Sequence, residues 1–211
     1  MNDQNAAFYR RIDLIRFQEF ARLIGLDKGA DIDCFYERIK NAKILLELGA
    51  GYGRVINGLL KKGFQGKIIA LERSPELLAY LKMHIPNIVL LKEQDLKKFQ
   101  INEKPEVVLW MWSGILEYSP LEQIETMQHI ASQMQENGIL IVEIPKQVRY
   151  VGQQMGNQII EVNMEWGNLQ AYLPTEKEMS NFCSLAGFSD LEILNYKTAT
   201  HLERTLFIYK K

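Results

Sequence analysis

Cysteine and histidine are scarce in this sequence, and neither sign of charge is in excess. Cys34 and Cys183 form no C-x-x-C pair, and the three histidines show no metal-ligand spacing. These absences favour a reducing compartment and predict no metal site. Twenty-five lysines and arginines oppose twenty-six acidic residues, which gives a formal net charge of -1. Without an overall positive field, we expect no nucleic-acid partner.

Long apolar runs and linker-like segments are also missing. The N-terminus lacks the apolar centre of a signal peptide, and no stretch approaches the ~20 apolar residues that span a bilayer. We therefore expect a cytoplasmic protein without a membrane partner. Hydrophobic residues make up 47% and charged residues 24% of the chain, as is typical of a globular fold. Because repeats and Gly/Ser-rich linkers are absent, residues 1–211 are expected to form a single domain.

From residue 44 onward, short apolar runs alternate with longer amphipathic stretches. Runs that are nearly continuous in apolar character are typical of parallel strands covered on both faces. Five central strands are predicted: Ile44–Leu48, Lys67–Leu71, Ile88–Leu91, Val107–Trp112 and Ile139–Ile144. Ser74–Pro75, Ser119–Glu122 and Thr175–Glu178 carry N-cap signals for helices. The last two strands, Leu191–Tyr196 and Thr205–Tyr209, are expected to form an antiparallel hairpin.

Residues 1–40 are predicted to be helical and to cap this sheet. One stretch carries an apolar stripe at about 3.6-residue spacing, and a second, shorter helix carries Phe35 and Ile39. The stripe comprises Phe8, Ile12, Ile15, Phe17, Phe20 and Leu23. We expect the cap to pack over the edge or mouth of the sheet, against a core formed by residues 42–211.

The first apolar strand runs directly into a glycine-rich turn and then a helix. Gly49, Gly51 and Gly53 alternate there, so the backbone can turn sharply and approach a ligand without Cβ collisions. A nicotinamide dinucleotide site requires a third glycine where this sequence has Arg54. The pattern present is E-x-G-x-G-x-G, beginning at Glu47. A core strand avoids a carboxylate unless that group serves the turn or a cationic ligand.

This turn resembles motif I of the class I S-adenosylmethionine-dependent methyltransferases of the small-molecule type. Acids at the ends of the next two strands, Glu72 and Asp95, extend the resemblance, which covers residues 42–211. The resemblance implies an α/β, Rossmann-like, doubly wound and mostly parallel seven-stranded sheet with an antiparallel last strand. It also implies S-adenosylmethionine as the cofactor and S-adenosylhomocysteine as its product.

The resemblance implies a role for each matching residue. Glu72 would accept hydrogen bonds from both ribose hydroxyls, Asp95 would meet the adenine amino group, and Leu96 would pack near the ring. Trp112 is expected near the sulfonium, since aromatic faces attract cations, and on one sheet face with Trp110. The predicted cofactor contacts are Glu47, Gly49, Ala50, Gly51, Gly53, Glu72, Arg73, Asp95, Leu96 and Trp112.

The connection formed by residues 150–173 is long and rich in amide side chains. Such a connection either closes over a substrate or carries an extra hairpin. The candidate acceptor contacts are Tyr118, Tyr150 and Trp166, with Glu161, Glu165 and Tyr172 beside them. If the acceptor proton must leave, Tyr118, Glu117 or His201 could remove it. The family pattern places the His201 region near the opposite end of the sheet.

The expected function is methyl transfer to a nitrogen or oxygen atom of a small molecule. The N/D-P-P-Y/F sequence of enzymes that methylate exocyclic base nitrogens is replaced here by Trp112–Ile115. Two alternatives stay open. One is an NAD-linked oxidoreductase on a Rossmann fold, which Arg54 argues against. The other is a domain that binds the cofactor or a partner without turnover.

Overall fold

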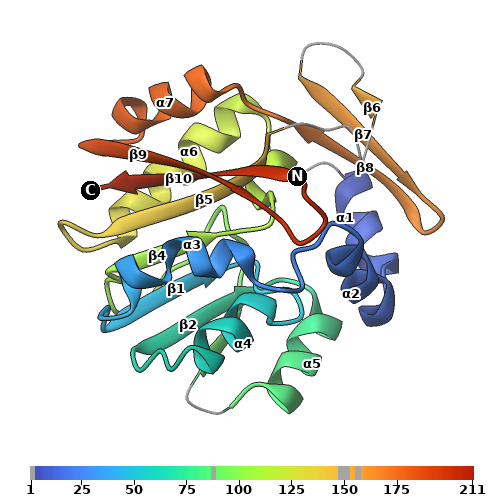
Figure 1. The fold of residues 1–211 in the computed structure, drawn as a ribbon, viewed down its shortest axis with the longest axis horizontal. Coiled ribbons are helices and arrows are strands. Elements are labelled where there is room, and N and C mark those ends of the chain that lie inside the picture. Colours follow the sequence, from blue (N-terminus) through green and yellow to red (C-terminus); the bar gives the residue numbers. More distant parts are fainter. Residues whose placement is uncertain (1–2, 87–88, 147–152, 155–157) are drawn as a thin grey trace.

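The computed structural model describes residues 3–86, 89–146, 153–154 and 158–211. Seven strands form the central sheet: β1 (Ile44–Leu48), β2 (Lys67–Glu72), β3 (Val89–Glu93), β4 (Val107–Trp110), β5 (Ile139–Pro145), β9 (Asp190–Lys197) and β10 (Glu203–Lys210). They lie in the order β3-β2-β1-β4-β5-β10-β9 (Figure 1). Neighbouring strands are parallel except where β10 pairs with β5 and β9. The predicted fold class is therefore confirmed.

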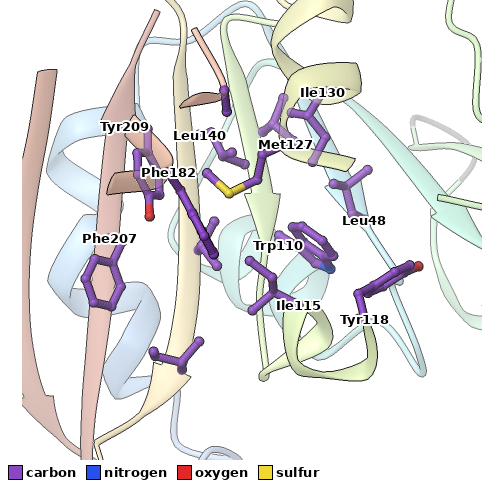
Figure 2. Close-up of a cluster of buried hydrophobic side chains, with 14 of the residues drawn as sticks. Leu48, Trp110, Ile115, Tyr118, Met127, Ile130, Leu140, Phe182, Phe207 and Tyr209 are labelled. Atoms are coloured by element: carbon purple, nitrogen blue, oxygen red, sulfur yellow. The ribbon is translucent and has the colours of Figure 1, made fainter. Parts of the chain in front are cut away.

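Helices cover both faces of this sheet. One face carries α3 (Ala30–Ile39), α4 (Arg54–Lys61) and α5 (Pro75–His84), and the other carries α6 (Pro120–Gln133) and α7 (Glu176–Leu185). Because side chains of the strands enter both cores, the central strands are nearly continuous in apolar character, as predicted, and Glu47 of β1 and Glu143 of β5 are buried exceptions. Figure 2 shows one of these cores, where Trp110, Met127 of α6 and Phe182 of α7 belong to one cluster.

Side-chain caps start the three helices that the sequence predicts. Ser74 accepts a hydrogen bond from a backbone N–H in the first turn of α5. Ser119 and Thr175 form capping boxes with Glu122 and Glu178, in which hydroxyl and carboxylate each accept a backbone N–H of the other residue. These local signals fix where α5, α6 and α7 begin.

The fourth strand is shorter than predicted. β4 ends at Trp110 because the backbone becomes left-handed at Trp112 (φ 50°) and Ser113 (φ 62°), which is incompatible with an extended strand. The third strand begins at Val89, and the predicted start at Ile88 lies outside the described residues.

The N-terminal segment forms two helices where one apolar stripe was predicted, α1 (Asp3–Arg11) and α2 (Leu14–Leu23). Asp13 accepts a hydrogen bond from a backbone N–H of the following turn at 2.8 Å and so starts a new helix. The stripe is wrong at Ile15 and Leu23, which are 67% and 66% exposed. Both helices lie at the end of the sheet where the parallel strands finish (Figure 1), whereas α3 packs on a face.

The connection after β5 carries a second sheet of three strands. These are β6 (Gln153–Gln154), β7 (Ile159–Met164) and β8 (Gly167–Tyr172), so the extra hairpin that was one expectation for this segment is present. The helix α1 packs against β8. The side-chain amide of Asn5 donates to the carbonyl of Gln170 at 2.8 Å and accepts from its N–H at 2.9 Å. Tyr150 lies outside the described residues.

Candidate active site

A cavity of about 450 Å³ lies where β1, β2 and β4 end. Its walls come from the turns that follow these strands and β3, and its roof comes from α1, α2 and the β7-β8 hairpin. Most of the lining is apolar or aromatic, and the volume is within the range of sites for small ligands. Open α/β sheets bind ligands at this end of their strands. Position and size therefore both indicate a small-molecule site.

The glycine turn after β1 has the backbone that its sequence predicts. Gly49, Gly51 and Gly53 have left-handed φ values of 67°, 57° and 82°. A Cβ at Gly53 would lie 2.9 Å from side-chain atoms of Leu81 and Ile85, so this glycine serves the packing of the turn against α5. Gly49 and Gly51 line the cavity, and Gly53 is not part of the lining that the described residues form.

Glu72, the last residue of β2, holds this turn in place. Its carboxylate accepts hydrogen bonds from the backbone N–H groups of Gly51 at 2.7 Å, Arg73 at 2.8 Å and Ser74 at 2.7 Å. Burial raises the pKa of Glu72, and the three donors act in the opposite direction. A carboxylate has about four acceptor positions. One of them stays for a ligand in the cavity, which Glu72 lines.

Glu47 lacks the partners that a buried carboxyl normally has. It is 3% exposed, and its Oε2 has no hydrogen-bond partner within the described ranges. Burial raises the pKa of Glu47 to about 8, and the nearby Arg54 guanidinium acts against that rise. A buried carboxyl without a partner costs folding free energy. A cationic group on a ligand would supply the missing partner.

Arg54 stands where a dinucleotide site requires glycine, and a buried ion pair fixes it there. Its guanidinium donates two hydrogen bonds to Asp31 of α3, at 2.9 and 2.6 Å. It also donates to the carbonyl of Leu26 at 3.0 Å. Because the fully buried Asp31 compensates its charge, Arg54 adds little net charge to the cavity.

A second buried ion pair reaches the cavity and was not predicted. Arg204 of β10 pairs with Glu143 of β5 and donates to Ser113 Oγ at 2.6 Å. Burial alone would raise the pKa of Glu143, but Arg204 and a hydrogen bond from Tyr196 at 2.6 Å outweigh it and lower that pKa. The two charged partners are 61 residues apart in the chain, so only the strand pairing brings them together.

The remaining predicted adenosine contacts line the same cavity. Arg73 follows β2, and Asp95 and Leu96 follow β3. Asp95 Oδ1 accepts a hydrogen bond from the N–H of Lys97 at 2.9 Å, which shapes this turn. The Asp95 side chain is otherwise exposed, so its carboxylate is available to a ligand.

Trp112 and Trp110 do not share one sheet face, contrary to the prediction. Trp110 belongs to the core under α6 and α7, whereas Trp112 packs against the core under α3 and α4. The left-handed backbone at Trp112 ends the strand alternation on which the prediction depended. The Trp112 ring stacks on Phe17 of α2 with centroids 4.8 Å apart, and the guanidinium carbon of Arg54 lies 6.0 Å from its centroid.

A short 3-10 turn, η1 (Gly114–Glu117), brings Glu117 and Tyr118 to the cavity wall. Glu117 Oε2 is shielded from solvent and has no hydrogen-bond partner in the part of the chain described. Burial raises the pKa of Glu117 to about 7, and a hydrogen bond from Tyr9 of α1 acts against the rise. Tyr9 was not predicted, because helical periodicity does not show which residue a cap helix will place opposite η1.

Two other candidates lie outside the lining formed by the described residues. Trp166, in the turn between β7 and β8, packs 5.9 Å from Phe8, and the Arg16 guanidinium carbon lies 5.6 Å from its ring centroid. A contact between Trp166 and an acceptor stays a prediction. His201 is exposed in the turn between β9 and β10. Because β10 begins opposite the end of β5, this turn lies at the cavity end of the sheet, which corrects the expected opposite end.

The other two histidines bond to backbone carbonyls, His84 to Tyr80 and His129 to Phe99. Across the described ranges, no group of three or more His, Cys, Asp or Glu side chains could hold a metal ion. Among the same residues, no helix is long and apolar enough to cross a bilayer.

The strand order and the turn after β1 define the class of fold, which is that of the class I methyltransferases. No protein-family profile and no curated protein matches the sequence. Among solved structures, an S-adenosylmethionine-dependent methyltransferase from Clostridium acetobutylicum matches with a TM-score of 0.71 and 14% identity. The match covers 92% of this chain and 98% of that one.

Two further structures have named substrates or ligands. CalS10, an amino pentose methyltransferase from Micromonospora echinaspora solved with S-adenosylmethionine, matches with a TM-score of 0.67 and 16% identity, over 94% of this chain and 97% of that one. The glycopeptide N-methyltransferase MtfA, complexed with S-adenosylhomocysteine, matches with a TM-score of 0.69 and 15% identity, over 94% and 98%. At identities of 14–16%, these three matches show that this chain shares its fold with these methyltransferases.

Proposed function

We propose that this chain is an S-adenosylmethionine-dependent methyltransferase that acts on a small molecule. The observation that carries the proposal is Glu47, a buried carboxyl with an unpartnered oxygen beside the glycine turn. The amino-acid end of S-adenosylmethionine bears an ammonium group that fits this carboxyl. The fold supports the same cofactor, since CalS10 was solved with it and MtfA with its product.

The cavity offers a matching group to each polar part of this cofactor. Glu47 would accept a hydrogen bond from the ammonium, Glu72 from one ribose hydroxyl through its remaining acceptor position, and Asp95 from the adenine amino group. The wall between them is formed by Gly49, Ala50, Gly51, Arg73 and Leu96. S-adenosylmethionine bound there would supply a methyl group already activated on a sulfonium.

The protein would contribute mainly orientation and exclusion of water. The stacked rings of Phe17 and Trp112 close the cavity beside the glycine turn. Since the leaving group is a neutral thioether, holding the acceptor in line with the methyl carbon is a large part of catalysis. The buried ion pair of Arg54 with Asp31 joins α4 to α3, and that of Arg204 with Glu143 joins β10 to β5, so both stabilise the walls of the cavity.

A small acceptor fits the roofed cavity, and its reacting atom is proposed to be nitrogen or oxygen. We propose one domain over residues 1–211, in which residues 1–40 cap the core of residues 42–211 and residues 150–173 form the acceptor side. An NAD-linked oxidoreductase is disfavoured, because the Arg54 side chain and its ion pair stand where the third glycine of that motif is required.

The first test is ligand-dependent stability. S-adenosylhomocysteine should raise the melting temperature of the purified protein, and NAD should not, because only a ligand of the native state stabilises it. Stabilisation by NAD alone would contradict the proposal. Absence of an effect from S-adenosylhomocysteine, confirmed by calorimetry on folded protein, would also contradict it.

The second test asks whether Glu47 binds the ammonium. Glu47→Gln should weaken S-adenosylhomocysteine binding about tenfold or more, since hydrogen bonds to charged groups contribute about 1.5–3 kcal/mol. Binding of 5′-methylthioadenosine, which lacks the amino-acid end, should be unchanged. Glu125→Gln, the same change on the exposed side of α6, is the control. Equal losses for both ligands in Glu47→Gln would remove Glu47 from the proposed role.

A further inference from the structure

The proposed function leaves one acid of the cavity wall without a role. Glu117 ends η1, which packs against β8. The buried side-chain amide of Gln123 contacts the carbonyls of Ile115 and Tyr118, both at 3.1 Å. It also contacts the carbonyl of Tyr172, the last residue of β8, at 3.2 Å. Gln123 therefore fixes Glu117 between the turn after β4 and the roof of the cavity.

Apolar side chains dominate the roof that faces this acid. Ile160 and Val162 of β7, Leu169 of β8 and Phe8 of α1 line the same cavity. Among these apolar side chains, the hydroxyl of Tyr9 of α1 donates a hydrogen bond to the Glu117 carboxyl. The Oε2 atom of Glu117 has no partner among the residues that the structure describes. An unpaired oxygen in such surroundings is a position for a donor that a ligand brings.

We propose that Glu117 binds the cationic nitrogen of the acceptor and removes a proton from it, with Tyr9 as a positioning residue. The acceptor is then a primary or secondary amine attached to an apolar or aromatic body. This inference rests on the proposed methyl transfer and names the substrate class of the same site.

The proton balance favours an amine over an alcohol. An ammonium R–NH3+ gives one proton to the Glu117 carboxylate, which yields R–NH2 and a carboxylic acid. The lone pair freed on nitrogen is the one that methyl transfer requires, and Glu117 later returns its proton to solvent. An ammonium has a pKa of about 10, and Glu117 has one of about 7. An alkanol hydroxyl is a much weaker acid, so Glu117 is too weak a base for it.

The charges that face Glu117 also favour an amine over a phenol, which is about as acidic as an ammonium. Tyr9 approaches from α1, Glu72 and Arg73 approach from the end of β2, and Tyr118 follows Glu117 in the chain. Proton transfer from a phenol to Glu117 would move the buried negative charge onto the phenolate, near Glu72. Proton transfer from an ammonium instead leaves both the amine and Glu117 neutral, so no buried charge remains on either partner.

The test compares two probes of nearly equal shape, benzylammonium and benzyl alcohol, on protein saturated with S-adenosylhomocysteine. At pH 8, the wild-type protein should bind benzylammonium at least about tenfold more tightly than benzyl alcohol. Glu117→Gln should remove this preference and leave the affinity for S-adenosylhomocysteine within about twofold. Glu125→Gln, an exposed position on α6, should keep the preference.

The pH dependence separates positioning by Tyr9 from a structural role. The preference for benzylammonium should fall as pH drops through about 7, because Glu117 takes up a proton there. The hydrogen bond from Tyr9 favours the charged carboxylate, so Tyr9→Phe should move the midpoint of this fall to higher pH. If Tyr9 had only a structural role, Tyr9→Phe would weaken the binding of both probes equally and leave the pH midpoint of the preference unchanged.

Each outcome decides between the two proposals. Equal affinity for the probes in the wild type, or a preference that survives Glu117→Gln, would overturn the inference while S-adenosylhomocysteine binding upholds the proposed function. Loss of S-adenosylhomocysteine binding in Glu117→Gln would place Glu117 in the cofactor site and also overturn it. If S-adenosylhomocysteine does not bind the wild type, both proposals fail. If Glu117→Gln does not fold, the pH midpoints of the benzylammonium preference in the wild type and in Tyr9→Phe are compared instead. A higher midpoint in Tyr9→Phe would support the inference, and an unchanged midpoint would overturn it.

Discussion

Two glycines of the turn after β1 share one backbone conformation but differ in the space around them. Gly49 and Gly53 both have left-handed φ values, 67° and 82°. A Cβ at Gly49 would meet no atom within 4 Å, whereas one at Gly53 would lie 2.9 Å from Leu81 and Ile85. The pair therefore separates backbone strain from steric crowding.

Alanine at each position should show this difference. Gly49→Ala is expected to cost about 1–2 kcal/mol of unfolding free energy, from the left-handed conformation alone. Gly53→Ala should lower the unfolding free energy by about 1–3 kcal/mol more than Gly49→Ala does, because α5 must shift. Urea denaturation of the two variants measures both values. Equal losses of unfolding free energy in the two variants would show that α5 shifts without a further cost in stability.

At this scale the sequence predicts the acids better than their partners. Glu47, Glu72 and Asp95 could be placed at strand ends because a parallel sheet brings its carboxyl ends to one edge. Tyr9 and Arg204 could not, because each reaches the cavity only through contacts between segments distant in the chain.

At the scale of elements, one side chain joins the first helix to the second sheet. Asn5 is 1% exposed, and its amide pairs with both backbone groups of Gln170, at 2.8 and 2.9 Å. It thus extends the hydrogen bonding of β8 to α1. Trp166 adds a ring contact with Phe8 of the same helix. The roof of the cavity is therefore one connected unit made from the two segments.

Asn5→Ala should loosen this unit. Two partly buried backbone groups of Gln170 would lose these partners, at a cost of about 1–3 kcal/mol, and amide hydrogen exchange in α1 should become at least about tenfold faster. Asn181→Ala, an exposed position on α7, is the matched control. If exchange in α1 is unchanged in Asn5→Ala, other contacts hold the helix.

Local signals explain which elements were predicted well. The capping boxes at Ser119 and Thr175 are complete within four residues, so the sequence contains all of their partners. The break between α1 and α2 depends on Asp13, which helical periodicity does not register. The end of β4 depends on left-handed backbone at Trp112 and Ser113, and neither residue type favours that conformation.

At the scale of the whole molecule, fully buried and half-buried acids together should give the free energy of unfolding a maximum near pH 5. Burial raises the pKa of Glu47 to about 8 and that of Glu117 to about 7. The unfolded chain releases these protons at a lower pH, so stability is lost as pH rises from about 4.5 to 8. Hydrogen bonds lower the pKa of Glu122 and of Glu178 to about 2, although burial opposes the shift. Their contribution is lost as pH falls below about 4.5.

Glu47→Gln should flatten the alkaline side of this profile. Each buried acid changes the unfolding free energy by at most about 1.4 kcal/mol per pH unit, so with these two pKa values the ligand-free wild type should lose up to about 6 kcal/mol between pH 5 and 8. The variant should lose about half as much, as measured by urea denaturation at both pH values. An identical loss in both proteins would mean that Glu47 is already ionised in the folded state.

The carboxylate of Glu72 both fastens the glycine turn, through Gly51, and faces the cavity. Any replacement there should therefore alter the shape of the glycine turn together with the proposed hydrogen bond to the ribose. An engineer who wants this scaffold to accept a modified adenosine should leave position 72 intact. Arg73 and Asp95, which line the same cavity, are the better positions to diversify.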